Sequence, residues 1–582
     1  MIERVSFETA ARRLFASAVF AAALFAIAVQ VSFAVSCTVV HHTPLNQADR
    51  ALLGADYVKA ETMYRTDLTA HPGDTELATG LVHALLRQQK VQDAADAMKA
   101  ALAVSPNSAD LIVLRGEVEF RQGMPWLAAQ TAQEANKLDP CNPRVLMLFA
   151  DIARISSLYA TAQNTINNAH KLDPEDREIR GEWISTLPLK QRIQEAESYL
   201  SQPTGDDAED VGHLRMALAH WKKLLNEPHK PCHLVSNTSA AEIPFTKLMY
   251  DAVRVRAFGL EVKLNNHVAR LQIDTGAGGL VVTRSTAEHA GLKAFSQSEM
   301  SGVGDKGEKA AYTAYVDSIR IGGLEFQDCL VEVLDSKHGL EDVDGLIGMD
   351  VFSKFLVTLD FPMRKLVLNP LPPRPGEGPA PAPELKTGDS SPEDTEADAD
   401  AQRSEENAGL KTRTPSAQAS NAPVEKQAAI AHGPQDRFIA PEMKDYTRVY
   451  RVGHNLILPA GINSEKVKLF ILDTGAWTTI ISPEAAREVT KVHGDSSGLE
   501  VRGISGKVEK VYTADNITFR FANLSQKATE VVAFDTSRIS KNVGMEISGF
   551  LGAKTLELLT IHIDYRDGLV RFDYDPNRGF RY

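Results

Sequence analysis

The stretch Leu271-Gln272-Ile273-Asp274-Thr275-Gly276-Ala277 decides the fold, and it returns later in the chain as Phe470-Ile471-Leu472-Asp473-Thr474-Gly475-Ala476. Each copy is a short apolar run that leads into Asp-Thr-Gly-Ala, and a hydroxyl residue, Thr283 or Ser482, stands nine positions after the aspartate. A carboxylate at the end of a buried strand costs free energy unless a partner or a reaction uses it. Two such carboxylates in one chain therefore predict a pair.

The features that follow each motif also repeat in the same order. Short runs rich in β-branched and aromatic residues, separated by glycine, predict strands around both motifs. Each copy continues with a glycine-rich hairpin tip (residues 302–305 and 503–506), an apolar-apolar-glycine segment (345–348 and 549–552) and a terminal hairpin. After the first such segment we expect an apolar helix through Val351, Phe352 and Phe355. The matched order predicts a duplicated, mainly-β domain with lobes at residues 243–370 and 438–582.

A different periodicity governs residues 45–230. Four prolines lie 34 residues apart, at Pro72, Pro106, Pro140 and Pro174, and an alanine stands twelve positions before each of them. A fixed 34-residue period with small residues at set places predicts two packed helices per repeat, and a proline ends one helix before the next begins. We expect an all-α solenoid of four repeats, a degenerate fifth and a closing helix near residues 211–225.

The N-terminal segment, residues 1–37, has the order of an export signal. It carries Arg4, Arg12 and Arg13, followed by an apolar run at residues 14–35 that is also long enough for a retained membrane anchor. Ser36-Cys37 also resembles the end of a lipoprotein signal. We therefore expect an exported protein, periplasmic or extracellular, and leave cleavage, lipidation and membrane attachment open.

The segment between the lobes, residues 371–437, contains ten prolines and no aromatic residue. Such a composition cannot bury enough surface to fold, so it predicts a disordered tether. For the whole chain, 582 residues are too many for one core, and a net charge of −13 argues against nucleic acid as the main partner. The four cysteines lack C-x-x-C spacing, so nothing supports a zinc or redox site; one disulfide can form, with its pairing unassigned.

The repeated motif set resembles that of aspartic peptidases of the retropepsin (retroviral) type over residues 250–370 and 440–582, and the helical repeat resembles the tetratricopeptide repeat (TPR). The first resemblance implies two facing lobes that each contribute one catalytic aspartate, Asp274 and Asp473. It also implies threonines that tie the active-site loops together, glycines that allow tight turns, and hairpin flaps that cover the substrate. The residues implied are Thr275, Gly276, Thr474 and Gly475 for the loops, and Gly302, Val303, Gly304, Gly503, Ile504 and Ser505 for the flaps. Ordinary hairpins stay open as an alternative to the flaps.

The chemistry of such a pair explains the residue types. Two carboxylates held close together cannot both ionise easily, so they share one proton. One carboxylate activates a water for attack on the peptide carbonyl, and the other protonates the carbonyl oxygen. We assign neither role permanently, because such a pair titrates as a unit. This chemistry needs no metal and no cofactor, and it predicts an aspartic endopeptidase that acts on peptide or protein substrates.

Other functions fit the same sequence. The solenoid offers a concave surface for a peptide or protein partner, or it acts as a spacer. The chain could then be a non-catalytic TPR scaffold whose protease-like lobes only grip peptides. Equivalent lobes could also pair between chains instead of within one. Trp477, which follows the second motif, either lines a substrate pocket or fills core.

Overall fold

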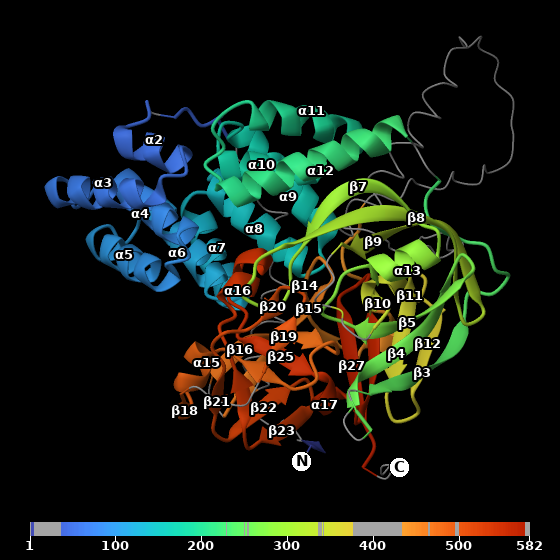
Figure 1. Cartoon of the computed structure of the whole chain (residues 1–582). Helices are drawn as coiled ribbons and strands as arrows, with labels where there is room; N and C mark the ends of the chain where they lie inside the picture. Colours follow the sequence, from blue (N-terminus) through green and yellow to red (C-terminus); the bar gives the residue numbers. More distant parts are fainter. Residues whose placement is uncertain are drawn as a thin grey trace, which may run out of the picture.

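The computed structural model describes residues 2–4, 37–42, 44–227, 230–249, 251–252, 255–335, 340, 343–375, 434–463, 466–494 and 500–576. Most of the expected export signal and of the expected tether lies outside these residues. Helices form the first part of the described chain and two β-rich lobes form the rest, which confirms the predicted fold class (Figure 1). Among the helices described, none is both long enough and apolar enough to cross a bilayer.

The helical region is a row of helix pairs whose spacing follows the 34-residue period. Each of the four prolines lies in a loop before a new pair, and two residues later a polar side chain caps the first helix of that pair. The alanines twelve positions before the prolines are buried, so the helix backbones can approach closely. The helices are α2 (Gln47–Leu53), α3 (Tyr57–Ala70), α4 (Thr75–Arg87), α5 (Val91–Val104), α6 (Ala109–Arg121), α7 (Pro125–Leu138), α8 (Pro143–Ile155), α9 (Tyr159–Leu172), α10 (Arg177–Ser185), α11 (Leu189–Leu200) and α12 (Ala208–Asn226).

The inner face of the solenoid is filled by charged residues of the chain itself. Arg87 in α4 bonds Glu178 in α10, with 2.9 Å between Nη2 and Oε1. Five helices, α5 to α9, lie between these two helices in the chain. The row therefore curves until its ends approach each other. The segment between α11 and α12 reaches the opposite end of the row, where the Tyr57 hydroxyl donates to Gly205 O at 2.9 Å and Arg87 pairs with Asp206 at 3.0 Å.

The first lobe places the first motif at the end of strand β5. Strand β10 runs parallel to β5 and antiparallel to β6, with Gly348 opposite Asp274. The helix expected after Gly348 is wrong in extent: one 3₁₀ turn replaces it, and Phe355 already starts strand β11, where burial alternates with the period of two of a strand. The elements are β2 (His233–Leu234), β3 (Ala241–Met249), β4 (Val255–Leu264), β5 (His267–Asp274), β6 (Leu280–Thr283), α13 (Arg284–His289), β7 (Lys293–Met300), β8 (Lys309–Ile321), β9 (Leu324–Leu334), β10 (Gly345–Gly348), η2 (Met349–Phe352), β11 (Phe355–Asp360) and β12 (Lys365–Pro370).

The second lobe repeats this arrangement around the second motif. Strand β25 runs parallel to β16 and antiparallel to β17, with Gly552 opposite Asp473. The elements are η3 (Pro441–Met443), β13 (Thr447–Arg448), β14 (Tyr450–Val452), β15 (Asn455–Ile462), β16 (Lys466–Asp473), β17 (Ile480–Ile481), α15 (Pro483–Arg487), β18 (Val492–His493), β19 (Arg502–Gly503), β20 (Gly506–Lys507), β21 (Tyr512–Ala514), β22 (Ile517–Phe521), β23 (Leu524–Ala528), β24 (Val531–Ala533), α16 (Ser537–Val543), β25 (Gly549–Gly552), α17 (Ala553–Leu556), β26 (Leu559–Asp564) and β27 (Leu569–Tyr574). A further strand, β1 (Ile2–Arg4), pairs with β23.

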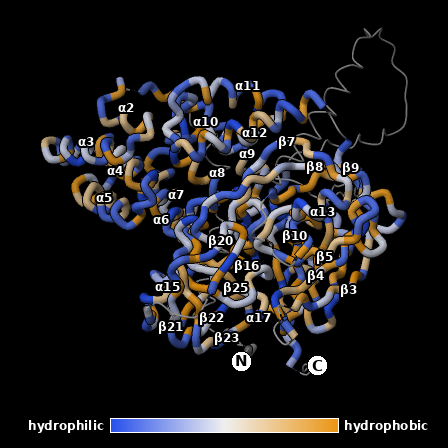
Figure 2. The backbone as a smooth tube through the Cα atoms, in the orientation of Figure 1, coloured by the Kyte–Doolittle hydropathy of each residue, from blue (hydrophilic) through white to orange (hydrophobic). Residues whose placement is uncertain are grey.

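The two lobes share a sheet and a core. Strand β11 of the first lobe pairs antiparallel with β26 of the second, with Val357 opposite Ile563. These strands belong to a continuous sheet in which β13, β27, β26, β11, β12 and β3 are neighbours in that order. Both Val357 and Ile563 are fully buried in one apolar cluster that draws on both lobes. Figure 2 shows hydrophobic and hydrophilic residues interspersed along the helices and strands of both regions. In this structure the lobes pair within one chain.

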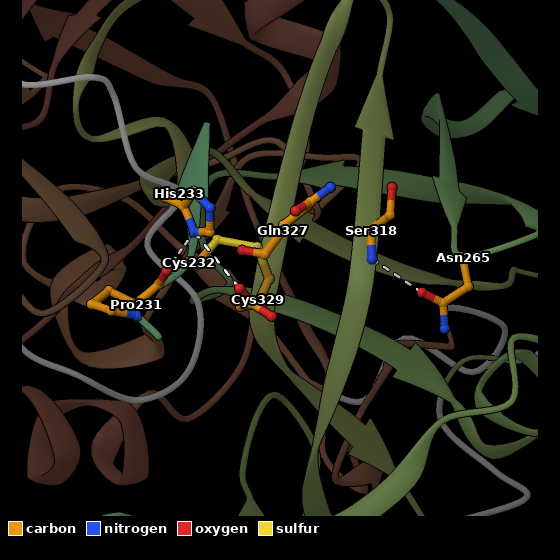
Figure 3. Close-up of a disulfide and its surroundings, with 8 residues drawn as sticks. Pro231, Cys232, His233, Asn265, Ser318, Gln327 and Cys329 are labelled. Carbon is orange, nitrogen blue, oxygen red and sulfur yellow. Dashed lines mark hydrogen bonds and ion pairs between the residues drawn. A yellow bond between two sulfur atoms is a disulfide. The ribbon is translucent and has the colours of Figure 1, made fainter. Parts of the chain in front are cut away.

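Two disulfides cross-link the chain, whereas the sequence supported one without a pairing. Cys37 bonds Cys141, which ties the segment before α2 to the loop before α8. Cys232 bonds Cys329, which ties the connection between α12 and the first lobe to strand β9 (Figure 3). Next to it, His233 pairs with Gln327 in the sheet. The second disulfide therefore anchors the end of the helical region to the first lobe.

The described ends of the segment between the lobes meet at one place. Arg374 donates to the fully buried Asp567 at 2.5 Å and to Gln435 Oε1 at 3.1 Å. Phe438 N also donates to Asp567 Oδ1, at 2.8 Å. Residues at both described ends of this segment therefore find a buried partner at the turn between β26 and β27.

The helical region packs directly on the second lobe. Ile155 of α8 is buried in an apolar cluster with Ile457 and Val508 of that lobe. At the end of α6, Arg121 O accepts from Glu546 N at 2.9 Å. The solenoid is therefore part of one assembly with the β-rich lobes.

Candidate active site

The two aspartates end equivalent strands and face each other across the interface of the lobes. Asp274 ends β5 and Asp473 ends β16, each beside a parallel strand that supports it from the same lobe. Gly276 N donates to Asp274 Oδ1 at 2.9 Å, and Gly475 N donates to Asp473 Oδ1 at 2.8 Å. Each carboxyl is thus held by the backbone of its own Asp-Thr-Gly turn.

The threonines of the two motifs join the turns to each other. The Thr275 hydroxyl donates to Leu472 O at 2.7 Å, and Thr474 N donates to that hydroxyl at 3.0 Å. The reciprocal bonds run from the Thr474 hydroxyl to Ile273 O at 3.2 Å and from Thr275 N to the Thr474 hydroxyl at 3.0 Å. Both threonines are 1% exposed, so these four bonds lie in a medium where an unmade bond is costly. The network fixes the relative position of the two aspartates.

The glycines of the motifs are required by close approach as well as by the turn. A Cβ atom at Gly276 would lie 2.8 Å from the carboxyl carbon of Asp473. A Cβ atom at Gly475 would lie closer still to the carboxyl of Asp274. Each glycine therefore faces the aspartate of the other lobe, and any side chain there would push the carboxyls apart.

The electrostatics of the pair favour a shared proton. Burial and the neighbouring charge of Asp473 raise the pKa of Asp274 well above its ordinary range. Burial also raises the pKa of Asp473, against the backbone N–H groups of Ala476 and Gly475, which bond the charged form. The two carboxyls are in hydrogen-bonding contact, and Asp473 is 8% exposed. The pair therefore holds a proton at pH values at which an exposed aspartate has lost its own.

The tips of the two glycine-rich hairpins contact each other. Ser505 N donates to Val303 O at 3.1 Å, and Gly302 N donates to the Ser505 hydroxyl at 3.1 Å. Gly304 has a φ of +127°, and a Cβ there would lie 2.5 Å from Gly506 O, so only glycine fits. The structure thus brings the six residues named as flap candidates into one interlocked contact.

Each tip also crosses to the other lobe. Val303 of the first lobe packs against the apolar cluster of the second lobe that Ala476 joins. Ile504 of the second lobe packs against the cluster of the first lobe that Ala277 joins. Both alanines directly follow an Asp-Thr-Gly motif, so the crossed tips lie over the two active-site loops.

Support beneath the loops includes residues that the sequence did not single out. Gly348 N donates to Gly279 O at 2.8 Å, and the buried carboxylate of Asp350 accepts from Gly279 N at 3.0 Å. In the second lobe the equivalent glycine, Gly552, donates its N–H to the Thr479 hydroxyl at 3.2 Å. The position of Asp350 two residues after the apolar-apolar-glycine segment was the available signal, but the second lobe has Lys554 at that position, which concealed it.

Trp477 packs against the common core of the lobes, with its ring 6.3 Å from that of Phe258. Among the described residues, one group could present three metal-ligand atoms within 4.8 Å of one another: Glu209, His213 and Glu308. These side chains already form ion pairs: His213 bonds Glu308 at 2.8 Å, and Lys541 bonds Glu209 at 3.1 Å. We therefore treat the group as part of the contact between α12 and the hairpin of β7 and β8.

Residues 260–351 match the family model described as "Aspartyl protease". The matched residues include the first motif, the first hairpin tip and strand β10. No curated protein matches the chain. A thermophilic TPR protein of Thermus thermophilus is 19% identical over 28% of this chain and 90% of that chain, with a TM-score of 0.24. The aspartic proteinase from Irpex lacteus is 13% identical over 58% of this chain and 98% of that chain, with a TM-score of 0.30. Part of the first lobe is thus similar in sequence to aspartyl proteases.

Proposed function

We propose that this chain is an aspartic endopeptidase whose water is activated by Asp274 and Asp473. The observation that carries the proposal is the facing pair of acids itself. Four reciprocal bonds between the Asp-Thr-Gly turns hold the two carboxyls in contact, and the pKa of each is raised. A structural role alone would not need two acids that face each other and hold a proton between them.

The arrangement supports a direct route for peptide hydrolysis. With one proton on the pair, the ionised carboxylate takes a proton from a water whose oxygen attacks the carbonyl carbon. The protonated carboxyl gives its proton to the carbonyl oxygen as the tetrahedral intermediate forms. Collapse of the intermediate breaks the C–N bond: a proton from the pair passes to the leaving nitrogen, and one hydroxyl of the intermediate returns its proton to the pair as its C=O bond forms. The pair ends with one proton, as it began.

The test is cleavage of an unfolded protein by the purified full chain. Replacement of either Asp274 or Asp473 by asparagine should abolish cleavage, because the remaining carboxyl then has no second carboxyl with which to share a proton. Asp317→Asn is a matched control, since Asp317 is exposed on β8. Cleavage that survives both active-site substitutions would overturn the proposal. Peptide binding without any turnover in the unsubstituted chain would favour the scaffold function instead.

We also propose an exported location, since two disulfides persist best in an oxidising compartment. Membrane attachment through residues 1–37 and recruitment of a protein partner by the solenoid remain proposals of the same kind. For the solenoid, the ion pairs of its inner face and the segment before α12 fill the space where a peptide would dock. A partner that used the inner face would have to displace them.

A further inference from the structure

The last helix of the solenoid, α12, is bonded to the first flap hairpin. Lys223 Nζ donates to Phe295 O at 2.6 Å and lies 4.7 Å from the centre of the Phe295 ring. One turn earlier, His220 Nδ1 and the Ser296 hydroxyl are 2.6 Å apart. These contacts join the helical region to strand β7, whose far end carries the flap tip (Figure 1).

The hairpin is shaped to receive this helix. Strand β7 has a bulge, because Ala294 pairs with Ala314 and Ser296 pairs with Thr313, so that Phe295 is the extra residue between them. A bulge takes the extra residue out of the ladder and redirects its groups. Here the carbonyl of Phe295 bonds Lys223, and the 8% exposed ring of Phe295 packs among its neighbours. The irregularity of the strand lies where α12 contacts it.

The other end of α12 reaches both the flap and the second lobe. His213 bonds Glu308, which directly precedes strand β8, at 2.8 Å. Lys541 of α16 in the second lobe bonds Asp207 at 3.2 Å and Glu209 at 3.1 Å. Helix α12 therefore holds the first flap near its base, at Phe295 and Ser296, and nearer its tip, at Glu308. The same helix contacts the second lobe, against which the tip residue Val303 packs.

We propose that α12 anchors the first flap in its closed position, so that the helical region controls the admission of substrate to the site proposed above. This inference rests on the proposed function for its meaning, and on the contacts of α12 for its geometry. A peptide chain can reach the aspartates only after the interlocked tips separate. Separation moves the β7–β8 hairpin, and that movement must break the bonds from Lys223, His220 and His213. These three are positioning residues, because they act through the flap and do not reach the aspartates.

The adjacent lysines of α12 provide a matched pair of variants. Lys223→Met removes the bond to the flap, whereas Lys222→Met removes a half-exposed ion pair at 2.5 Å with Glu197 of α11, which does not involve the flap. Because all four cysteines are in disulfides, cysteines introduced in place of Lys306 at the exposed tip and of Lys554 in the second lobe can be labelled selectively with nitroxides. Electron resonance then reports the distance between tip and lobe.

We expect Lys223→Met to increase the population with a long distance about tenfold, the effect of losing roughly one charge-assisted hydrogen bond. Lys222→Met should leave the distribution unchanged, and Lys223→Arg, which keeps a donor, should restore it. If Lys223→Met folds poorly, His220→Ala is the substitute variant, and it should also increase the population with a long distance. Identical distributions in Lys223→Met and Lys222→Met would overturn the anchor.

Admission is tested separately by the association rate of a fluorescent peptide with the Asp274→Asn chain. Adding Lys223→Met should raise this rate about tenfold, because opening of the flap precedes binding. A flap that opens more often without faster association would refute control of admission. The distance measurement needs no catalysis, so the anchor can stand or fall independently of the peptidase proposal.

Discussion

Replacement of Thr275 by valine tests how strongly the threonine hydroxyls hold the lobes together. The hydroxyl donates to Leu472 O at 2.7 Å and accepts from Thr474 N at 3.0 Å, and Thr275 is 1% exposed. Valine has nearly the same shape, so the change leaves one buried carbonyl and one buried N–H group without partners. Each such group costs about 1–3 kcal/mol, so we expect the lobes to lose about 2–6 kcal/mol of stability.

Scanning calorimetry measures this loss as a shift of the midpoint for unfolding of the lobes. A change of 1 kcal/mol moves the midpoint of a domain of this size by about 2–4 °C, so the expected fall for Thr275→Val is about 10 °C. Thr555→Val is the control, because its hydroxyl is also buried but pairs with Thr479, at 2.8 Å, within one lobe. Losing that single bond should cost about 1 kcal/mol. Equal falls for the two variants would refute the reasoning that Thr275 joins two lobes.

The same substitution should reduce cleavage at temperatures at which the protein stays folded. The hydroxyl bonds set the distance between the two Asp-Thr-Gly turns, and proton sharing requires the carboxyls to remain in contact. Full cleavage by a folded Thr275→Val chain, together with the lower midpoint, would show that the hydroxyl stabilises the lobes without positioning the aspartates.

Two further predictions concern the tether and the acidic pair. A short glycine segment in place of residues 376–433 should leave the lobes assembled, because Arg374 and Gln435 already meet at 3.1 Å; gel filtration and calorimetry check this, and separation of the lobes would contradict it. Replacement of Asp274 by asparagine should raise the unfolding midpoint at about pH 8, because a raised pKa means that ionisation destabilises the folded state as the pH rises above the unfolded pKa. The gain should vanish at about pH 3, where both states are protonated, and midpoints that differ equally at all pH values would exclude this explanation.

The contacts of α12 and α8 make the helical region an integral part of the assembly. Its last helix holds the first flap hairpin, and Ile155 is buried in the second lobe. Its inner face is filled by bonds such as that between Arg87 and Glu178. These contacts are consistent with our proposal of a solenoid that supports the two lobes and holds the first hairpin, and they leave no open peptide groove between the residues named.

Much of the fold could be predicted because its signals are local. The 34-residue period predicted the helix pairs: each proline lies two residues before a residue that caps a helix, such as Asp74. The alanines of the period are buried where helices pack against each other. The two Asp-Thr-Gly turns and the glycine segments indicated the strand ends that carry Asp274 and Asp473. The helix expected through Phe355 was misjudged, because a period-two pattern began where a helical pattern was expected.

The sequence by itself determined the repeat, the duplicated lobes and the residues of the acidic pair, since periodicity and motif order act over a few neighbouring residues. Only the tertiary structure decided which distant groups meet. Four cysteines allow three pairings, and the fold selects Cys232 with Cys329 through the register of a sheet. The bond from Lys223 to the bulge at Phe295 and the meeting of both tether ends at Asp567 are of the same kind. Contacts between residues far apart in the chain leave no periodic trace, because they arise from packing of complete elements against one another.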